Sequence, residues 1–237
     1  MPLNIVPAIS QIKLNSAEIK IAKKLEEIYK EESETSWLYI DLRMNIQPNE
    51  ENYEPNFVLI DPQRGVCVIE AFGANKNSII NVTRAEFTTK KGGEKNPGLK
   101  NRQCFSLVKG LLEGNDDLWN EDGEFIVPLF ARVLFTNMNN NDLREWQKEL
   151  KYDPVSYIVS NQIPKMTPSS LFQEEGKQLS AEQIKIRSSY NLAGISFTPK
   201  QIAEEVSKHI PNFEITYNTD FRQVIADSWP SSIDDSH

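Results

Sequence analysis

Hydrophobic residues recur at intervals of three and four over residues 15–30, which predicts an amphipathic helix. Asn15 and Ser16 are both suited to cap its first turn. Glu18 lies three residues after Asn15, where a carboxylate closes a capping box and faces the positive end of the helix. The sequence therefore starts with a well-defined helix whose first turn carries an acidic residue.

Two short apolar runs, residues 57–60 and 66–70, flank a turn with Pro and Gly at 61–65, which predicts a β-hairpin. Both runs are almost continuously hydrophobic, so we expect strands buried on both faces of a sheet. Asn96-Pro97 predicts an N-cap followed by a helix. Together the patterns predict an α/β fold, with further strands at 37–42, 78–89, 125–135 and 155–159, a helix at 97–111, a short surface helix at 143–150, a polar turn at 90–95 and an acidic loop at 113–124.

The composition changes over residues 161–183 to Pro, Ser, Gln and Glu, which predicts a linker. We therefore expect one domain over 10–160 and a separate C-terminal tail over 184–237. The tail has the pattern of a short α/β segment, with a strand at 189–192, a helix at 199–209 and a strand at 213–217.

The net charge is −8, and hydrophobic residues make up 39% of the chain, enough for a core. No run approaches the roughly 18 apolar residues of a membrane-spanning helix, and the N-terminus lacks the pattern of a signal peptide. We expect a cytoplasmic protein that makes no membrane contact. Cys67 and Cys104 stand in apolar patterns and are expected to be buried thiols.

The hairpin region resembles a known family. Residues 16–25, the run from Pro55-Asn-Phe-Val-Leu-Ile-Asp to Val66-Cys-Val-Ile-Glu70, and Asn96-Pro97 look like the nuclease-related (NERD) domain of the PD-(D/E)xK nucleases over about residues 14–160. The resemblance implies a restriction-endonuclease-like core sheet flanked by helices. Such sites hold a divalent cation with carboxylates and support the attacking water with a lysine.

Carried over residue by residue, the resemblance places the family's helix glutamate at Glu18 and its strand glutamate at Glu70, the implied metal ligand. The family's aspartate falls on Asn56 and its lysine on Phe72. These are the implied catalytic positions. At two of them the charged side chain of the family is replaced by an uncharged one, Asn56 and Phe72. A glutamine expected after Asn96-Pro97 falls near Lys100, unless Gln103 replaces it.

The resemblance thus implies a degenerate metal-dependent nuclease that binds Mg²⁺ or Mn²⁺ weakly. It also implies association with nucleic acid in DNA processing or defence, with DNA and a helicase or another protein as partners. Residues 84–109 carry seven basic and two acidic residues, suited to phosphate contacts. The expected nucleic-acid-binding residues are Lys90, Lys91, Lys95, Lys100 and Arg102.

Three alternatives stand for these residues. In the first, a cluster of carboxylates with a lysine displaced along the chain still cleaves nucleic acid. In the second, the fold binds DNA without cleaving it. In the third, Glu18 only caps its helix, Glu70 pairs with a neighbour and the lysines are a solvated rim. The first alternative uses Glu18, Glu70, and Glu54 or Asp61, with Lys76, Lys90 or Lys91.

The tail carries a second resemblance. The run from Ile184-Lys-Ile-Arg-Ser-Ser-Tyr to Asp220-Phe-Arg-Gln-Val-Ile-Ala-Asp-Ser-Trp-Pro closely resembles the C-terminal substrate-binding region of the NAD-dependent L-threonine 3-dehydrogenases. The resemblance places Trp229 beside the substrate. It also implies NAD bound on a Gly-x-Gly-x-x-Gly turn and a Tyr-x-x-x-Lys pair that transfers the proton.

Neither motif of that family is present in the tail or elsewhere. The 237 residues contain no Gly-x-Gly-x-x-Gly, and neither Tyr190 nor Tyr217 is followed by lysine four residues later. We therefore expect no NAD. Besides the nuclease interpretation, the sequence leaves two alternatives, a fragment of an NAD-dependent L-threonine dehydrogenase and a protein-interaction scaffold without catalysis.

Overall fold

The computed structural model describes most of the chain up to residue 173. The described residues are 3–6, 8–33, 35–40, 55–61, 64–114, 118–119, 123–125, 127–173, 190–192 and 195–197.

A six-stranded sheet forms the centre of the fold, with strand order β1-β2-β3-β4-β8-β9. The pairs β2/β3 and β3/β4 are antiparallel, and the pairs β1/β2, β4/β8 and β8/β9 are parallel. With the helices that flank it, this sheet confirms the α/β class. The strands are β1 (Leu3–Val6), β2 (Ser36–Ile40), β3 (Phe57–Asp61), β4 (Gly65–Phe72), β8 (Leu129–Phe135) and β9 (Val155–Val159).

Helix α1 (Ser16–Ile28) begins as its sequence predicts. The Asn15 side chain accepts hydrogen bonds from the backbone N–H groups of Ala17 and Glu18. In return, the Glu18 carboxylate accepts one from the Asn15 N–H at 2.7 Å. Asn15, rather than Ser16, is therefore the cap, and the capping box is complete.

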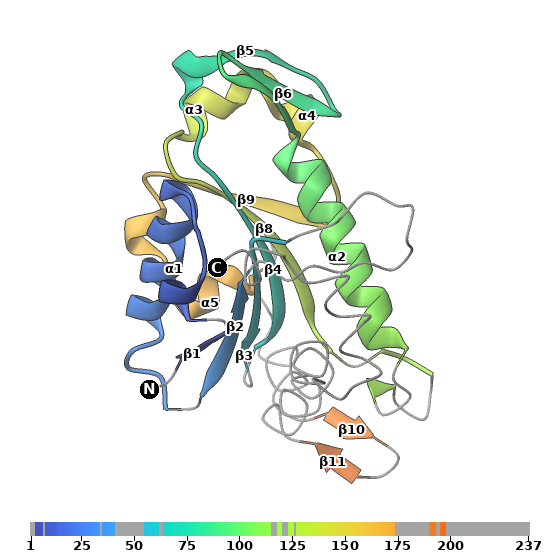
Figure 1. Cartoon of the computed structure of the whole chain (residues 1–237). Coiled ribbons are helices and arrows are strands. Elements are labelled where there is room, and N and C mark those ends of the chain that lie inside the picture. Colours follow the sequence, from blue (N-terminus) through green and yellow to red (C-terminus); the bar gives the residue numbers. More distant parts are fainter. Residues whose placement is uncertain are drawn as a thin grey trace, which may run out of the picture.

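Successive residues of β4 face opposite sides of the sheet, as the pleat requires. Cys67 and Ile69 pack in one apolar cluster with Ile21 and Leu25 of α1. Val68 packs in a second cluster that contains residues of α2 (Pro97–Glu113). Helices α1 and α2 therefore cover opposite faces of the sheet (Figure 1). The expectation that the hairpin is buried on both faces is correct.

The start of α2 is tied to the sheet by its own polar side chains. Asn96 caps the helix, because its side-chain oxygen accepts a hydrogen bond from the Gly98 N–H. One turn later, the buried Asn101 side chain donates to the carbonyl oxygens of Val68 on β4 and Arg132 on β8, at 3.2 and 3.3 Å. These bonds fix the helix over two parallel neighbouring strands.

A separate three-stranded sheet lies beyond one end of β4, joined to it through the short 3₁₀ helix η2 (Lys76–Ser78). It consists of β5 (Ile79–Val82), β6 (Glu86–Thr89) and β7 (Gly92–Lys95), all antiparallel (Figure 1). We expected a polar turn over 90–95. Instead the turn is short, because Gly92 adopts a φ of 138°, and the chain returns as β7.

Three further elements differ from the sequence prediction. Strand β1 pairs in parallel with β2, although we placed the start of the domain at residue 10. The expected helix over 143–150 is three short turns, α3 (Asn140–Leu143), η4 (Arg144–Trp146) and α4 (Gln147–Leu150). The first segment of the expected linker forms η5 (Ile163–Lys165) and α5 (Pro168–Leu171).

The residues around α5 are part of the core. Ile163, Met166, Leu171 and Phe172 are buried in the same apolar cluster as α1. The Phe172 ring also packs edge-on against Phe130, with centroids 5.4 Å apart. The compact unit therefore continues past residue 160, through at least residue 172.

Of the tail, the structure describes only a two-stranded antiparallel pair, β10 (Tyr190–Leu192) and β11 (Ile195–Phe197). The expected helix at 199–209, the strand at 213–217 and Trp229 lie outside the described residues.

Cys67 and Cys104 are buried free thiols, as expected, and burial raises the pKa of each to about 12. No helix in the described part of the chain has the length and apolar character needed to cross a membrane.

A polar cluster closes the β3–β4 hairpin against the end of α1. Asp61, only 1% exposed, accepts hydrogen bonds from the Tyr29 hydroxyl and from Arg64, each at 2.7 Å. Arg64 also pairs with Glu32, just beyond α1. Burial raises the pKa of Tyr29, and the neighbouring carboxylate adds to the shift, so the phenol remains a proton donor.

This cluster yields a stability prediction. Asp61→Ala removes the acceptor that both Tyr29 and Arg64 use, and buried partners left unpaired are costly. We expect the free energy of unfolding to fall by about 3 kcal/mol in urea denaturation. The matched control is Glu27→Ala, which removes the exposed carboxylate of the Lys24–Glu27 pair and should change stability by no more than about 0.5 kcal/mol. Equal losses in both variants would contradict the assigned role of Asp61.

Candidate functional site

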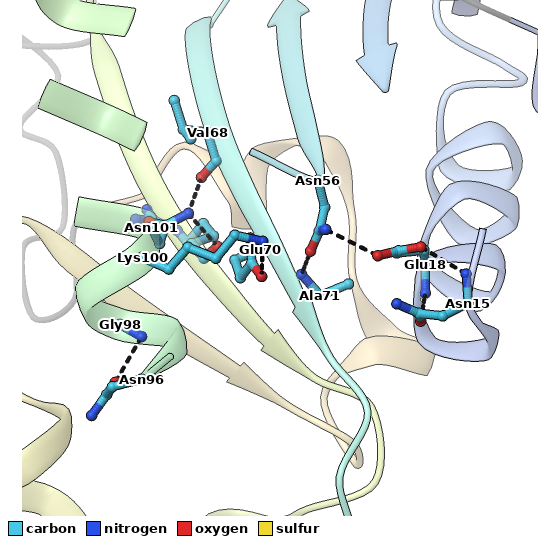
Figure 2. Close-up of polar contacts among 11 residues, drawn as sticks. Asn15, Glu18, Asn56, Val68, Glu70, Ala71, Asn96, Gly98, Lys100 and Asn101 are labelled. Atoms are coloured by element: carbon cyan, nitrogen blue, oxygen red, sulfur yellow. Dashed lines mark hydrogen bonds and ion pairs between the residues drawn. The ribbon is translucent and has the colours of Figure 1, made fainter. Parts of the chain in front are cut away.

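An ion pair joins the central sheet to the first turn of α2. The Glu70 carboxylate, on β4, lies 2.8 Å from the Nζ of Lys100 (Figure 2). Glu70 is 6% exposed, whereas the Lys100 side chain is 27% exposed. Lys100 therefore lies between the buried carboxylate and the surface.

The charge state of Glu70 is strongly perturbed. Burial raises the pKa of its carboxyl group to about 7, and the positive charge of Lys100 offsets part of that shift. The negative charge of Glu18 raises the pKa further. The second carboxylate oxygen, Oε2, is buried and has no hydrogen-bond partner within the described residues. A carboxyl group in this state exchanges its proton near neutral pH.

A second polar pair lies on the α1 side of the hairpin. The Asn56 side-chain nitrogen donates to the Glu18 carboxylate at 3.0 Å, and its oxygen accepts from the Ala71 N–H at 2.7 Å (Figure 2). Asn56 thus acts as donor and acceptor at once. An aspartate would accept from Ala71 but would repel Glu18, so the asparagine suits this contact.

The three predicted catalytic residues are neighbours, but they do not form one carboxylate cluster. Figure 2 shows Glu70 directed toward α2, whereas Asn56 and Glu18 meet on the side of α1. Ala71, which bonds to Asn56, follows Glu70 directly in β4. Within the described ranges, no group of three or more His, Cys, Asp or Glu side chains is arranged to hold a metal ion.

The lysine beside Glu70 is not one of those proposed from the sequence as a displaced lysine. Lys100 falls near the position at which the nuclease resemblance implied glutamine, and Gln103 makes no hydrogen bond to Glu70 among the described residues. Lys76 instead pairs with Glu145 at 3.2 Å. The sequence feature that could have identified Lys100 is its position in the first helical turn after the Asn96-Pro97 cap.

The remaining sequence candidates have structural roles or lie outside the described part. Phe72 packs edge-on against Phe87 and Phe135, with centroids 5.1 and 5.5 Å apart. Asp61 belongs to the cluster with Tyr29 that closes the hairpin. Glu54 and Trp229 are outside the described residues.

The basic residues are spread over several elements. Lys90 and Lys91 are exposed at the turn between β6 and β7, and Arg102 is exposed on α2. Lys95 is half-buried at the end of β7, and Lys100 pairs with Glu70. Of the three alternatives drawn from the sequence, the third describes Glu18 and Glu70 best, because Glu18 caps its helix and Glu70 pairs with a neighbour.

Comparison with known proteins finds relatives for part of the chain. A stretch of 57 residues, 24% of the chain, is 58% identical to the mitochondrial L-threonine 3-dehydrogenase of Sus scrofa. The corresponding enzyme of Bos taurus is 52% identical over 58 residues, and an uncharacterized epimerase/dehydratase of Staphylococcus haemolyticus is 47% identical over 58 residues. About a quarter of the chain is therefore similar to dehydrogenases and epimerase/dehydratases.

The matched stretch has about the length of the tail, residues 184–237, and agrees with the resemblance found there. It spans 15% of both mammalian enzymes and 18% of the staphylococcal protein, so the chain covers less than a fifth of these relatives. No protein-family profile matches the chain. No solved structure matches it either.

These relatives correct two expectations. The prediction of a nuclease-related, DNA-binding protein is wrong, because these relatives are two L-threonine 3-dehydrogenases and an epimerase/dehydratase rather than nucleases. Among the described residues, Asn56 bonds to Glu18 and Lys100 to Glu70, and no group of three or more His, Cys, Asp or Glu side chains could hold a metal ion. The expectation of Mg²⁺ or Mn²⁺ without NAD is also overturned, because dehydrogenases are the class that uses a nicotinamide cofactor.

The Glu70 pKa predicts how stability depends on pH. Between about pH 4.5 and 7, the folded protein keeps a proton on Glu70 that the unfolded chain has lost. Its contribution to stability is therefore complete below pH 4.5 and is lost as the pH rises through 7. Relative to Glu70→Gln, we expect the wild-type free energy of unfolding to fall by up to about 3 kcal/mol across this window.

The measurement is urea denaturation of both proteins at several pH values. Glu113→Gln is the matched control, because Glu113 pairs with Lys109 on a partly exposed face of α2 and should leave the slope unchanged. Identical pH dependence of the wild type and Glu70→Gln would show that the Glu70 carboxyl group titrates normally.

Proposed function

We propose that the chain takes part in an NAD-linked dehydrogenase reaction on a small substrate of the L-threonine type. The main support for this proposal is the 58% identity over 57 residues with the L-threonine 3-dehydrogenase of Sus scrofa. The related epimerase/dehydratase of Staphylococcus haemolyticus supports the same broad class of enzyme. In this proposal the tail, residues 184–237, supplies the substrate-binding region.

The role of the tail is to hold the substrate. Trp229 is the residue that we assign to substrate binding, because large aromatic side chains commonly line small-molecule sites. A nicotinamide cofactor, when bound to such an enzyme, accepts the hydride. The tail's own contribution is to bind and orient the molecule that is oxidised.

The described domain does not fit the nicotinamide cofactor itself. A dinucleotide's pyrophosphate is held by a glycine-rich turn between the first strand and the first helix. Here β1 and α1 are joined by residues 7–15, which contain no glycine. We therefore derive no cofactor step from the described residues, and propose that the cofactor is held outside them, by the rest of this chain or by a partner chain.

This proposal predicts L-threonine binding that depends on Trp229. In isothermal titration of the full chain with L-threonine, Trp229→Ala should weaken the affinity by roughly tenfold or more. The matched control is Trp119→Ala, which removes the same side chain from the described domain, where it packs on Phe125. The control should retain the wild-type affinity.

Two results would contradict the proposal: no L-threonine binding by the wild-type chain, or equal affinities for the wild type and Trp229→Ala. A parallel titration with NAD⁺ separates a chain that binds the cofactor alone from one that needs the partner. NADH absorbance then reports whether L-threonine is oxidised.

A second candidate function is favoured by the Glu70–Lys100 ion pair, in which a buried carboxylate lies 2.8 Å from an ammonium group and burial raises the pKa of Glu70 to about 7. We propose that Glu70 is a proton donor and acceptor in the described domain, with Lys100 as the positioning residue that holds its carboxylate. A group whose pKa lies near the working pH is the most effective in general acid–base catalysis. The Glu70 oxygen Oε2 is buried and has no hydrogen-bond partner within the described residues, so it is the atom to which we assign the exchanging proton.

The Glu70 carboxyl group can be titrated directly by carbon-13 NMR, with its resonance assigned from its loss in Glu70→Gln. We expect a midpoint of about 7 in the wild type. Lys100→Met should raise it further, because the stabilising positive charge is removed. A midpoint near the ordinary glutamate value of 4.5 would exclude the second candidate.

A further inference from the structure

A cavity of about 790 Å³ lies beside the edge strand β9, away from Glu70 and Lys100. Its walls come from the start of β8, from α3 to α4, and from the segment that leads into β9. The volume is within the range of pockets that hold small organic molecules, roughly 300–1,000 Å³. Neither the dehydrogenase proposal nor the Glu70 site uses this cavity.

Most of the charged residues that line the cavity are cationic. Arg132, Arg144 and Lys151 are on its walls, and Asp153 is the one acidic residue among them. This excess of positive charge occurs in a chain whose net charge is −8. A concave site with a positive charge of this kind attracts and concentrates anions, although the protein as a whole is negatively charged.

Arg132 is the most informative of these residues. It is 3% exposed, and its guanidinium donates to the carbonyl oxygens of Ala131, at 2.8 Å, and of Gln173. It also lies over the Phe130 ring, 5.6 Å from the centroid. No carboxylate pairs with it in the part of the chain that the structure describes. Buried charges are normally neutralised by a charged partner, so this arginine leaves an uncompensated positive charge in the cavity wall within the described fold.

Arg144 and Lys151 extend the positive charge to the rim. Both are exposed, and neither forms an ion pair with any described residue. Arg144 begins η4 and Lys151 directly follows α4, with Gln147 between them on the same wall. A guanidinium and an ammonium group placed in this way supply charge-assisted hydrogen bonds to phosphate or carboxylate oxygens.

The remaining lining favours a ligand with a carbon skeleton over a bare inorganic ion. Leu143, Leu150 and Tyr157 supply apolar and aromatic surface, and Asn140 and Gln162 supply amide groups. This combination of apolar walls with a few polar groups is typical of sites for small organic molecules.

We propose that this cavity binds a small organic anion, a molecule that carries a phosphate or carboxylate group on an apolar or aromatic body. The anionic group contacts Arg144 and Lys151 at the rim and experiences the charge of Arg132. The body packs against the apolar wall. The proposal rests on residues 129–162 and is independent of the tail.

The test is isothermal titration of the full chain at low ionic strength with three probes. Adenosine monophosphate carries a phosphate on an aromatic body, citrate carries carboxylates, and adenosine is the uncharged body alone. We expect one or both anions to bind and adenosine to bind at least about tenfold more weakly than adenosine monophosphate. Which anion binds identifies the ligand as a phosphate ester or a carboxylate.

The discriminating variant is the double substitution Arg144→Gln/Lys151→Gln, which removes two exposed charges without a described partner. It should weaken anion binding by roughly tenfold or more. The matched control, Lys90→Gln/Lys91→Gln, changes the net charge equally at the exposed β6–β7 turn and should alter the affinity by less than about twofold. Binding of neither anion, equal weakening in both double variants, or adenosine affinity equal to that of adenosine monophosphate would overturn the proposal.

Discussion

The burial of β4 on both faces is the constraint on which the rest of the described structure depends. Because α1 covers one face and α2 the other, every side chain of this strand after Gly65 is inside the protein. The apolar side chains of β4 are stable in this buried position because they pack against their neighbours. The Glu70 carboxylate is costly to bury, so its ionisation depends on the ammonium group of Lys100, which α2 places beside it. The position of α2, set by Asn96 and Asn101, is thereby linked to the proton affinity of the strand.

The elements that could be predicted are those whose signals are local. The cap at Asn15, the proline after Asn96 and the apolar runs of the hairpin each specify structure within a few residues. Strand β7 was not predicted, because Gly92 and Gly93 are poor strand formers and pair only through the register of β6. The segment around α5 has a polar composition and is ordered by packing on α1, far away in the sequence. That contact left no local signal.

In the candidate site, too, some features could be predicted from the sequence and others depend on contacts between residues far apart in the chain. Glu18, Asn56 and Glu70 could be selected from the sequence because the nuclease resemblance places its site positions on them, at the start of the first helix and along the hairpin. Their partners could not be selected, since the Glu70–Lys100 pair spans 30 residues and the Asn56–Glu18 pair spans 38. A resemblance also suggested roles that the partners do not support. Phe72 in place of lysine is explained by its aromatic neighbours, which fill the space between the central sheet and the small sheet.

Asn96 has a consequence for which substitutions the fold accepts. Its side-chain oxygen caps α2, while its nitrogen donates to the carbonyl oxygens of Thr83, before β6, and Glu149, in α4. Aspartate is among the best helix caps in general, and serine follows closely. Neither can replace this residue fully, because aspartate offers no donor and serine offers only one. The Asn96 amide therefore links three segments of the chain, and the substitutions that most helix caps tolerate would each lose at least one of its hydrogen bonds.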